Sequence, residues 1–230
     1  MQPKSPIISV SDLYQKINDI NIRIIDTRFS LFNKNEGKAL FDKSHITGAI
    51  YADLDKDLAG NITESSGRHP LPNVNTISGK LRKWGINKLT HVIVYDHNNG
   101  SIASRLWWLL KWLGHEKVSV LDGGFLEWEK SNFPIDNSIS NYEPGNFVPV
   151  LNEDKTWTAE LINKWIKQSK KFLLIDARDE NRYRGIEEPI DKKAGHIPGA
   201  INIPFTLFLE ENGVWKNLIE IRAIWKKYQV

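Results

Sequence analysis

Two short sets of charged residues and histidines recur along the chain at nearly the same spacing. Asp26-Thr27-Arg28 precedes His45, and Asp176-Ala177-Arg178 precedes His196, so the aspartates lie 150 residues apart and the histidines 151. Carboxylate, guanidinium and imidazole groups can pair, exchange hydrogen bonds or move protons. Because both copies carry them, we expect a structural role, with the aspartates bonding the backbone at a strand end and the histidines not serving as metal ligands.

One reactive group is missing from the chain, which contains no cysteine. Disulfides, thiolate metal sites and a cysteine nucleophile are therefore excluded within these 230 residues. A net charge of +3 with both signs mixed is too weak for a nucleic-acid surface, and no apolar run approaches a membrane span. The N-terminus lacks a signal-peptide pattern. We expect a cytoplasmic protein that binds neither nucleic acid nor membrane and needs no metal or cofactor.

The size of the repeat indicates two similar domains rather than a solenoid. A hydrophobic content of 40% with nine Trp is ample for their cores. We place the first domain at 1–135 and the second at 151–230, joined by a linker at 136–150 where prolines and glycine interrupt any periodicity. Strand-like and helix-like segments alternate, which predicts an α/β fold with mostly parallel open sheets.

The elements that must position the repeated residues follow from the hydrophobic pattern. In the first domain the pattern predicts strands at 23–26, 46–51, 92–95 and 118–121, and helices within 7–20 and at 77–84, 101–114 and 125–130. In the second it predicts a helix at 159–168, a strand at 172–176, a second strand within 196–203 and a helix at 219–228. The stretch 92–95 is uniformly apolar, as in a strand buried on both faces.

In this order the motifs resemble the tandem rhodanese-type sulfurtransferases, the family of thiosulfate sulfurtransferase and 3-mercaptopyruvate sulfurtransferase. The resemblance rests on the repeated Asp-x-Arg and His-Ile-x-Gly-Ala motifs and on the segments 67–72, 95–108, 121–128 and 182–189. It implies two rhodanese-like domains, the second incomplete. It also implies transfer of sulfane sulfur from a small anionic donor, thiosulfate or 3-mercaptopyruvate, to cyanide or another thiophilic acceptor, which the sequence does not identify.

The resemblance assigns roles to individual residues. Arg184 matches the arginine that binds the anionic end of the donor, and Asp55 and His69 match auxiliary residues with proposed proton-relay roles. Asp96 stands at the nucleophile position of the first-domain loop, which makes that loop the inactive type because a carboxylate repels an anionic donor. The same residue also suits a strand-end carboxylate that caps the following helix.

In the family, a cysteine of the second domain carries the sulfur as a persulfide. By the resemblance that cysteine would lie just beyond Val230, so the chain as given is expected to be truncated before its nucleophile and inactive. Ile190 follows Glu188-Pro189 where the 3-mercaptopyruvate enzymes have a second arginine, which favours thiosulfate. Two other interpretations stay open: a non-catalytic rhodanese-like module that binds anions or a protein partner, and a remnant left by a frameshift or stop.

Overall fold

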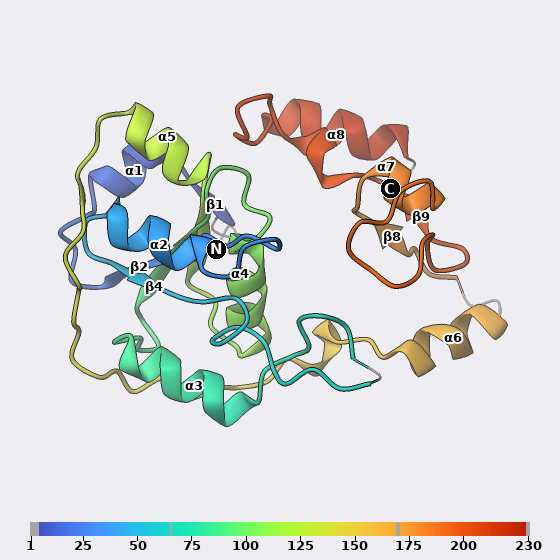
Figure 1. Ribbon diagram of the computed structural model, residues 1–230, viewed down its shortest axis with the longest axis horizontal. Helices are drawn as coiled ribbons and strands as arrows, with labels where there is room; N and C mark the ends of the chain where they lie inside the picture. The colour runs from blue at the N-terminus through green and yellow to red at the C-terminus, as the bar shows by residue number, and fades with distance from the viewer. Residues whose placement is uncertain (1–4, 65, 169–170, 229–230) are drawn as a thin grey trace. The chain divides into compact units, whose positions relative to one another are not determined.

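The structure is a computed structural model that describes residues 5–64, 66–168 and 171–228. The chain divides into two compact units, Met1–Glu153 and Asp154–Val230, called unit 1 and unit 2 below (Figure 1). The segment 136–150, predicted to be a linker, falls within unit 1. Among the described residues, no helix combines the length and the apolar character needed to cross a membrane.

Unit 1 is built on a five-stranded parallel sheet. Its strands lie in the order β1 (Ile7–Ile8), β6 (Val118–Leu121), β5 (His91–Tyr95), β2 (Ile22–Asp26) and β4 (Ala49–Tyr51). Alternate residues of the central strands enter two different cores: Ile25 and Val94 pack on one face, while Ile24 and Ile93 pack on the other. The predicted strand at 92–95 is therefore confirmed, including its burial on both faces.

Helices cover both faces of this sheet. The helices α3 (Val74–Lys83) and α4 (Ala103–Trp112) contribute to one core, and α1 (Val10–Tyr14), α2 (Glu36–Lys43) and α5 (Gly124–Lys130) contribute to the other (Figure 1). Side-chain caps begin two of them: Ser9 accepts a backbone N–H of α1, and Asn73 accepts two of α3. The predicted α/β class with a mostly parallel open sheet is confirmed.

Two predicted elements of unit 1 are wrong in detail. The stretch 46–51 is not one strand, because the chain turns at Gly48, whose φ is +81°, between β3 (His45–Ile46) and β4. The strand β3 pairs antiparallel with β7 (Ile135–Asp136), which spans the predicted boundary between the first domain and the linker. The predicted helix within 7–20 contracts to α1 because β1 pairs with β6. Both differences come from pairing with distant segments, which local periodicity does not register.

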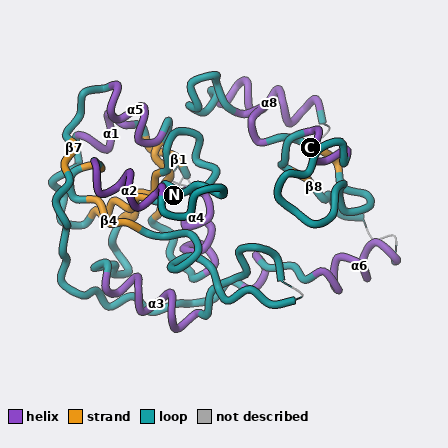
Figure 2. The backbone as a smooth tube through the Cα atoms, in the orientation of Figure 1, coloured by secondary structure: helices purple, strands orange, loops and turns teal. Residues whose placement is uncertain are grey.

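Unit 2 is more open. Its strands β8 (Ile175–Asp176) and β9 (Ile201–Asn202) form a two-stranded parallel sheet. Figure 2 labels β8. The short helix η1 (Glu153–Lys155) is followed by α6 (Ala159–Lys167), α7 (Glu180–Arg184), η2 (Phe205–Phe208) and α8 (Leu218–Lys227). Within the described part of unit 2, these three α-helices contain no fully buried residue. The predicted helices at 159–168 and 219–228 therefore form, but their apolar faces are only partly buried.

Candidate functional site

The repeated Asp-x-Arg motif forms the same clamp in both units. Arg28 Nε donates to the two carboxylate oxygens of Asp26 at 3.1 and 2.8 Å, and its Nη2 donates at 2.6 Å to the carbonyl just before His45. Arg178 Nε donates to the two oxygens of Asp176 at 3.0 and 3.1 Å, and its Nη2 donates at 2.6 Å to the carbonyl just before the second motif histidine. The clamp therefore fixes the backbone where each histidine turn begins.

The two motif histidines are engaged in packing. His45 is fully buried, its Nδ1 donates to the carbonyl of Phe41 at 2.7 Å, and the two rings stack 3.8 Å apart. His196 repeats this arrangement with Tyr183, at 2.8 Å for the hydrogen bond and 3.8 Å for the stacked rings. These are contacts of scaffold residues, in line with the structural role expected for both positions.

Asp96 lies buried at the end of β5 and turns its carboxylate into the loop that follows. Its Oδ1 accepts the Gly100 N–H at 3.0 Å, and its Oδ2 accepts those of Ile102 and Ala103 at 2.8 and 3.1 Å. The carboxylate thereby satisfies donors at the N-terminus of α4 and interacts favourably with the helix dipole. These N–H groups bind an anion that the chain itself supplies, so the helix-cap interpretation accounts for this residue.

The predicted auxiliary residues Asp55 and His69 lie together in unit 1. His69 Nε2 is 3.1 Å from Asp55 Oδ1, and the other carboxylate oxygen pairs with Lys34 Nζ at 3.3 Å. The edge of the imidazole meets the ring of Phe29, with 6.0 Å between centroids. Because a carboxylate only accepts hydrogen bonds when ionised, Nε2 carries the proton of a neutral His69, and Nδ1 carries the lone pair.

The surroundings of His69 favour that neutral form. Burial is the largest cause that lowers the pKa of the imidazole, and the positive charges of Arg68 and Arg105 lower it further, while Asp55 raises it. A neutral imidazole with an open Nδ1 can accept a proton. The arrangement is therefore chemically able to serve as a proton acceptor, and its use in a reaction is a proposal.

Arg184, predicted to bind the donor, is the last residue of α7 in unit 2. Its side chain is 62% exposed, and its Nη1 is 3.4 Å from Oε1 of Glu180, one turn earlier. The residue lines a hollow of about 270 Å³ together with Tyr183, Asn202 and Leu207. A single long contact between exposed charges is weak, so most of the guanidinium donors stay available to an anion. Asp55, His69 and Asp96 belong to unit 1, whereas Arg184 belongs to unit 2.

The two preceding arginines, Arg178 and Arg182, both pair with Glu188. Arg182 Nη2 donates to both of its oxygens at 2.8 and 3.1 Å, and Arg178 Nη1 donates at 3.3 Å. The Ile190 and Asp191 N–H groups donate to the same carboxylate, and these bonds, chiefly that from Arg182, lower the pKa of Glu188 to about 2. Glu188 was predicted only as part of a motif, and the two arginines upstream of it, Arg178 and Arg182, were the available signal.

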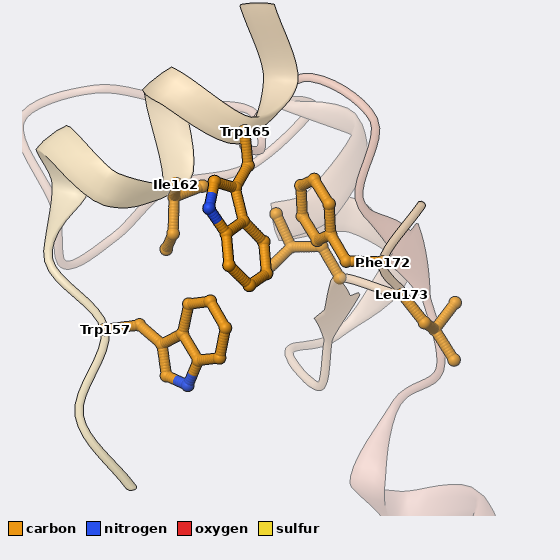
Figure 3. A pocket seen from close by; sticks show the side chains of 6 residues that line it. Trp157, Ile162, Trp165, Phe172 and Leu173 are labelled. Atoms are coloured by element: carbon orange, nitrogen blue, oxygen red, sulfur yellow. The ribbon is translucent and has the colours of Figure 1, made fainter. Parts of the chain in front are cut away.

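An apolar hollow of about 350 Å³ also lies in unit 2. Figure 3 shows the rings of Trp157, Trp165 and Phe172 turned toward the same space. The Trp157 and Trp165 rings meet edge to face at 4.4 Å, and Phe172 contacts Trp165 at 5.6 Å. Among the residues that the structure describes, no titratable side chain lines this hollow, so they offer packing surface rather than catalytic groups.

Comparison with known proteins connects this geometry to a family. A family model described as "Rhodanese-like domain" matches residues 9–131 and 158–229. The chain is 35% identical over 209 residues to a probable 3-mercaptopyruvate sulfurtransferase of Pseudomonas aeruginosa, covering 90% of this chain and 73% of that protein. It is 34% identical over 215 residues to the thiosulfate sulfurtransferase of Rattus norvegicus, covering 91% and 71%.

The 3-mercaptopyruvate sulfurtransferase of Mus musculus is 37% identical over 194 residues, covering 83% of this chain and 64% of the mouse protein. Among solved structures, the crystal structure of SseA from Escherichia coli, a 3-mercaptopyruvate sulfotransferase with the "Rhodanese" fold, superposes with a TM-score of 0.84. That match has 29% identity and covers 99% of this chain and 85% of the other.

Proposed function

We propose that this chain, which belongs to the rhodanese-like domain family, takes part in sulfur transfer by binding a small anionic sulfur donor. Its relatives are named as sulfurtransferases, and the observation that carries the proposal is the state of Arg184. Arg178 and Arg182 pair with the buried carboxylate of Glu188. Arg184 lines an open hollow, and its one ion pair in the described part of the chain is with the exposed carboxylate of Glu180 at 3.4 Å. A guanidinium is a fixed fork of donors that suits a sulfonate-like or carboxylate group.

We favour thiosulfate over 3-mercaptopyruvate as the donor. Relatives of both names match the chain at similar identity, so the names alone do not decide. Ile190 supplies an apolar side chain after Pro189, and its N–H is already bound to Glu188 at 3.1 Å. That segment therefore presents one available guanidinium rather than two for the anionic end of the donor.

Transfer of a sulfane sulfur through a covalent intermediate needs a thiolate to attack the donor. The 230 residues contain none, so this polypeptide by itself should bind the donor without turning it over. The acceptor remains defined only by its chemistry, a thiophilic species such as cyanide. We expect no thiocyanate from thiosulfate and cyanide above a heat-treated sample of the same polypeptide, and turnover by a preparation of verified mass would contradict the proposal.

Binding is tested by titrating thiosulfate into the chain while recording NMR shifts or heat. We expect millimolar or weaker affinity, because an exposed ion pair contributes at most about 1 kcal/mol. Arg184→Ala should abolish it, since the fork of donors is removed. Arg222→Ala, an exposed arginine on α8, is the matched control and should bind as the parent does. Parental binding by the Arg184 variant would overturn the assignment.

A non-catalytic module is the second candidate. Two observations favour it: the chain has no cysteine, and the loop of unit 1 is filled by the Asp96 carboxylate. Such a module would bind thiosulfate and non-transferable anions such as sulfate alike. A clear preference for thiosulfate over sulfate in the same titration would argue for the sulfurtransferase proposal and against the module.

A further inference from the structure

The guanidinium of Arg105, on α4 of unit 1, donates hydrogen bonds to carbonyl groups of one loop. Its Nη2 donates to the carbonyls of Leu58, His69 and Pro70 at 3.2, 3.0 and 3.0 Å, and its Nε donates to that of Leu58 at 3.3 Å. A backbone bond from Gly60 to Pro70, at 3.0 Å, closes the same loop. One side chain thus holds both ends of the segment 58–70.

This arrangement removes part of the charged guanidinium of Arg105 from water, which is energetically unfavourable. Burial lowers the pKa of Arg105, and no ion pair involves it in the described part of the chain. Arg105 is partly buried, and a cation that loses water in this way is stabilised only when its donors are well satisfied. Three carbonyl acceptors provide that here, and they require the loop to keep one conformation. A neutral side chain, or the single ammonium of a lysine, cannot bridge carbonyls at both ends of the loop.

One of the three carbonyls belongs to His69 itself. The backbone of His69 is therefore fixed at the same point from which its imidazole extends 3.1 Å to Asp55. In the described chain Nε2 has this partner, while no hydrogen bond engages Nδ1. A shift of the loop would break the bond to Asp55. The proton of the neutral imidazole would then no longer be held on Nε2, and Nδ1 would no longer be kept unprotonated.

We propose that Arg105 is the positioning residue of the Asp55–His69 pair: by pinning the loop 58–70 it keeps Nε2 of His69 on Asp55 and Nδ1 open to a proton. The relevance of this pair to catalysis rests on the proposed sulfur-transfer function, but the positioning itself does not. Arg105 belongs to unit 1, whereas Arg184 and the hollow that it lines belong to unit 2. Arg105 acts only through the backbone and the charge that His69 experiences.

The test uses the full chain and NMR of its six histidines, with long-range ¹H–¹⁵N spectra that report tautomer and titration. His69→Gln assigns the signal. In the parent we expect the Nε2-protonated tautomer. In Arg105→Met the two tautomers should mix, because the loop is no longer fixed. The midpoint of His69 should also differ from that of the parent, since the positive charge that lowers it and the contact with Asp55 that raises it are both changed. Arg82→Met, which removes an arginine bonded to Phe147, is the control and should leave the His69 signals unchanged.

Arg105→Lys separates positioning from charge. It keeps the positive charge, so a purely electrostatic role predicts parental signals, whereas positioning predicts mixed tautomers. Arg105→Lys also tests the positioning role if Arg105→Met does not fold. Parental tautomer and midpoint in either folded Arg105 variant would overturn the proposal. Because no sulfur donor is present, the outcome is independent of whether thiosulfate binds Arg184.

Discussion

At the scale of single residues, the two units differ in the charged side chain that occupies each candidate anion position. Asp96 fills the loop after β5 with a carboxylate that accepts three backbone N–H groups, whereas Arg184 in unit 2 keeps its guanidinium exposed. The carboxylate of Asp96 is covalently attached to the chain and cannot diffuse away, so a dilute external anion cannot compete with it for these N–H groups. Unit 1 is therefore a scaffold in which the anion-binding geometry has become part of the fold.

His115 gives unit 1 a pH-dependent stability. The imidazole is 2% exposed and donates from Nε2 to the Thr90 carbonyl at 2.9 Å; burial is the main cause that lowers its pKa from 6.5. The unfolded chain then binds more protons than the folded one, so this stabilisation is full above pH 6.5 and is lost as the pH falls through the folded-state pKa. We expect the urea concentration at the midpoint of unfolding of unit 1 to decrease as the pH is lowered from 7.5 to 5.

The matched measurement compares two histidine variants across the same pH range. His115→Gln should flatten the slope, because the titrating buried group is gone. His97→Gln, at an exposed position after β5, should keep the slope of the parent. Equal slopes in the parent and the His115 variant would show that other groups govern the acid sensitivity.

At the scale of elements, the segment 138–152, called the strap, belongs to the packing of unit 1. Tyr142 donates to the Gly48 carbonyl at 2.7 Å, and its ring lies under the Arg23 guanidinium at 3.9 Å. Gly145 approaches Ile86 so closely that a Cβ would lie 2.2 Å from its carbonyl oxygen. Backbone bonds from Val150 and Asn152 to the end of α4, at 2.9 and 2.8 Å, complete the attachment.

Phe147 is the anchor of the strap, at 3% exposed within the core that α3 and α4 form. Phe147→Ala should destabilise unit 1 by about 3 kcal/mol, because buried aromatic side chains lose transfer energy and leave a cavity. Chemical denaturation of the fragment 1–153 measures this. Val148→Ala is the control at an exposed neighbouring position and should change the stability little. A Phe147 variant as stable as that control would show that the strap does not contribute to the core.

The strap also shows what a sequence pattern predicts and what it does not. Long periodic segments such as α4, and the uniformly apolar β5, were predicted within a few residues, because their own spacing encodes burial. The strap has no period; single anchors such as Tyr142 and Phe147 attach it to distant residues. The helix α2 was missed for a related reason, since only Gly37 and Phe41 of its eight residues are buried.

The candidate site divides in the same way. The resemblance to the rhodanese family predicted Arg184, and it predicted Asp55 and His69, which the structure brings within hydrogen-bond distance of each other. The supporting groups were not predicted, because Arg105 and Glu188 act through carbonyls and side chains that meet only after folding.

At the scale of the whole molecule, the two units differ in how much apolar surface they bury. Unit 1 has two extensive cores, while the described α-helices of unit 2 contain no fully buried residue and Trp157 is 50% exposed. We expect unit 2 to open first, so that amides of β2, β5 and α4 exchange slowest and those of α6 and α7 fastest. Hydrogen exchange with mass spectrometry measures this, and equal protection of both units would contradict it.

The duplicated Asp-x-Arg clamp places one ion pair in two environments within a single chain. Arg28 and Asp26 are 2% and 0% exposed, whereas Arg178 and Asp176 are 29% and 12% exposed, with the same 2.6 Å contact in each pair. Mobile ions screen charges that water reaches and scarcely affect those that it does not. Ionic strength therefore acts on the second clamp and spares the first, so the entrance to the His196 turn should loosen in concentrated salt while the entrance to the His45 turn stays fixed.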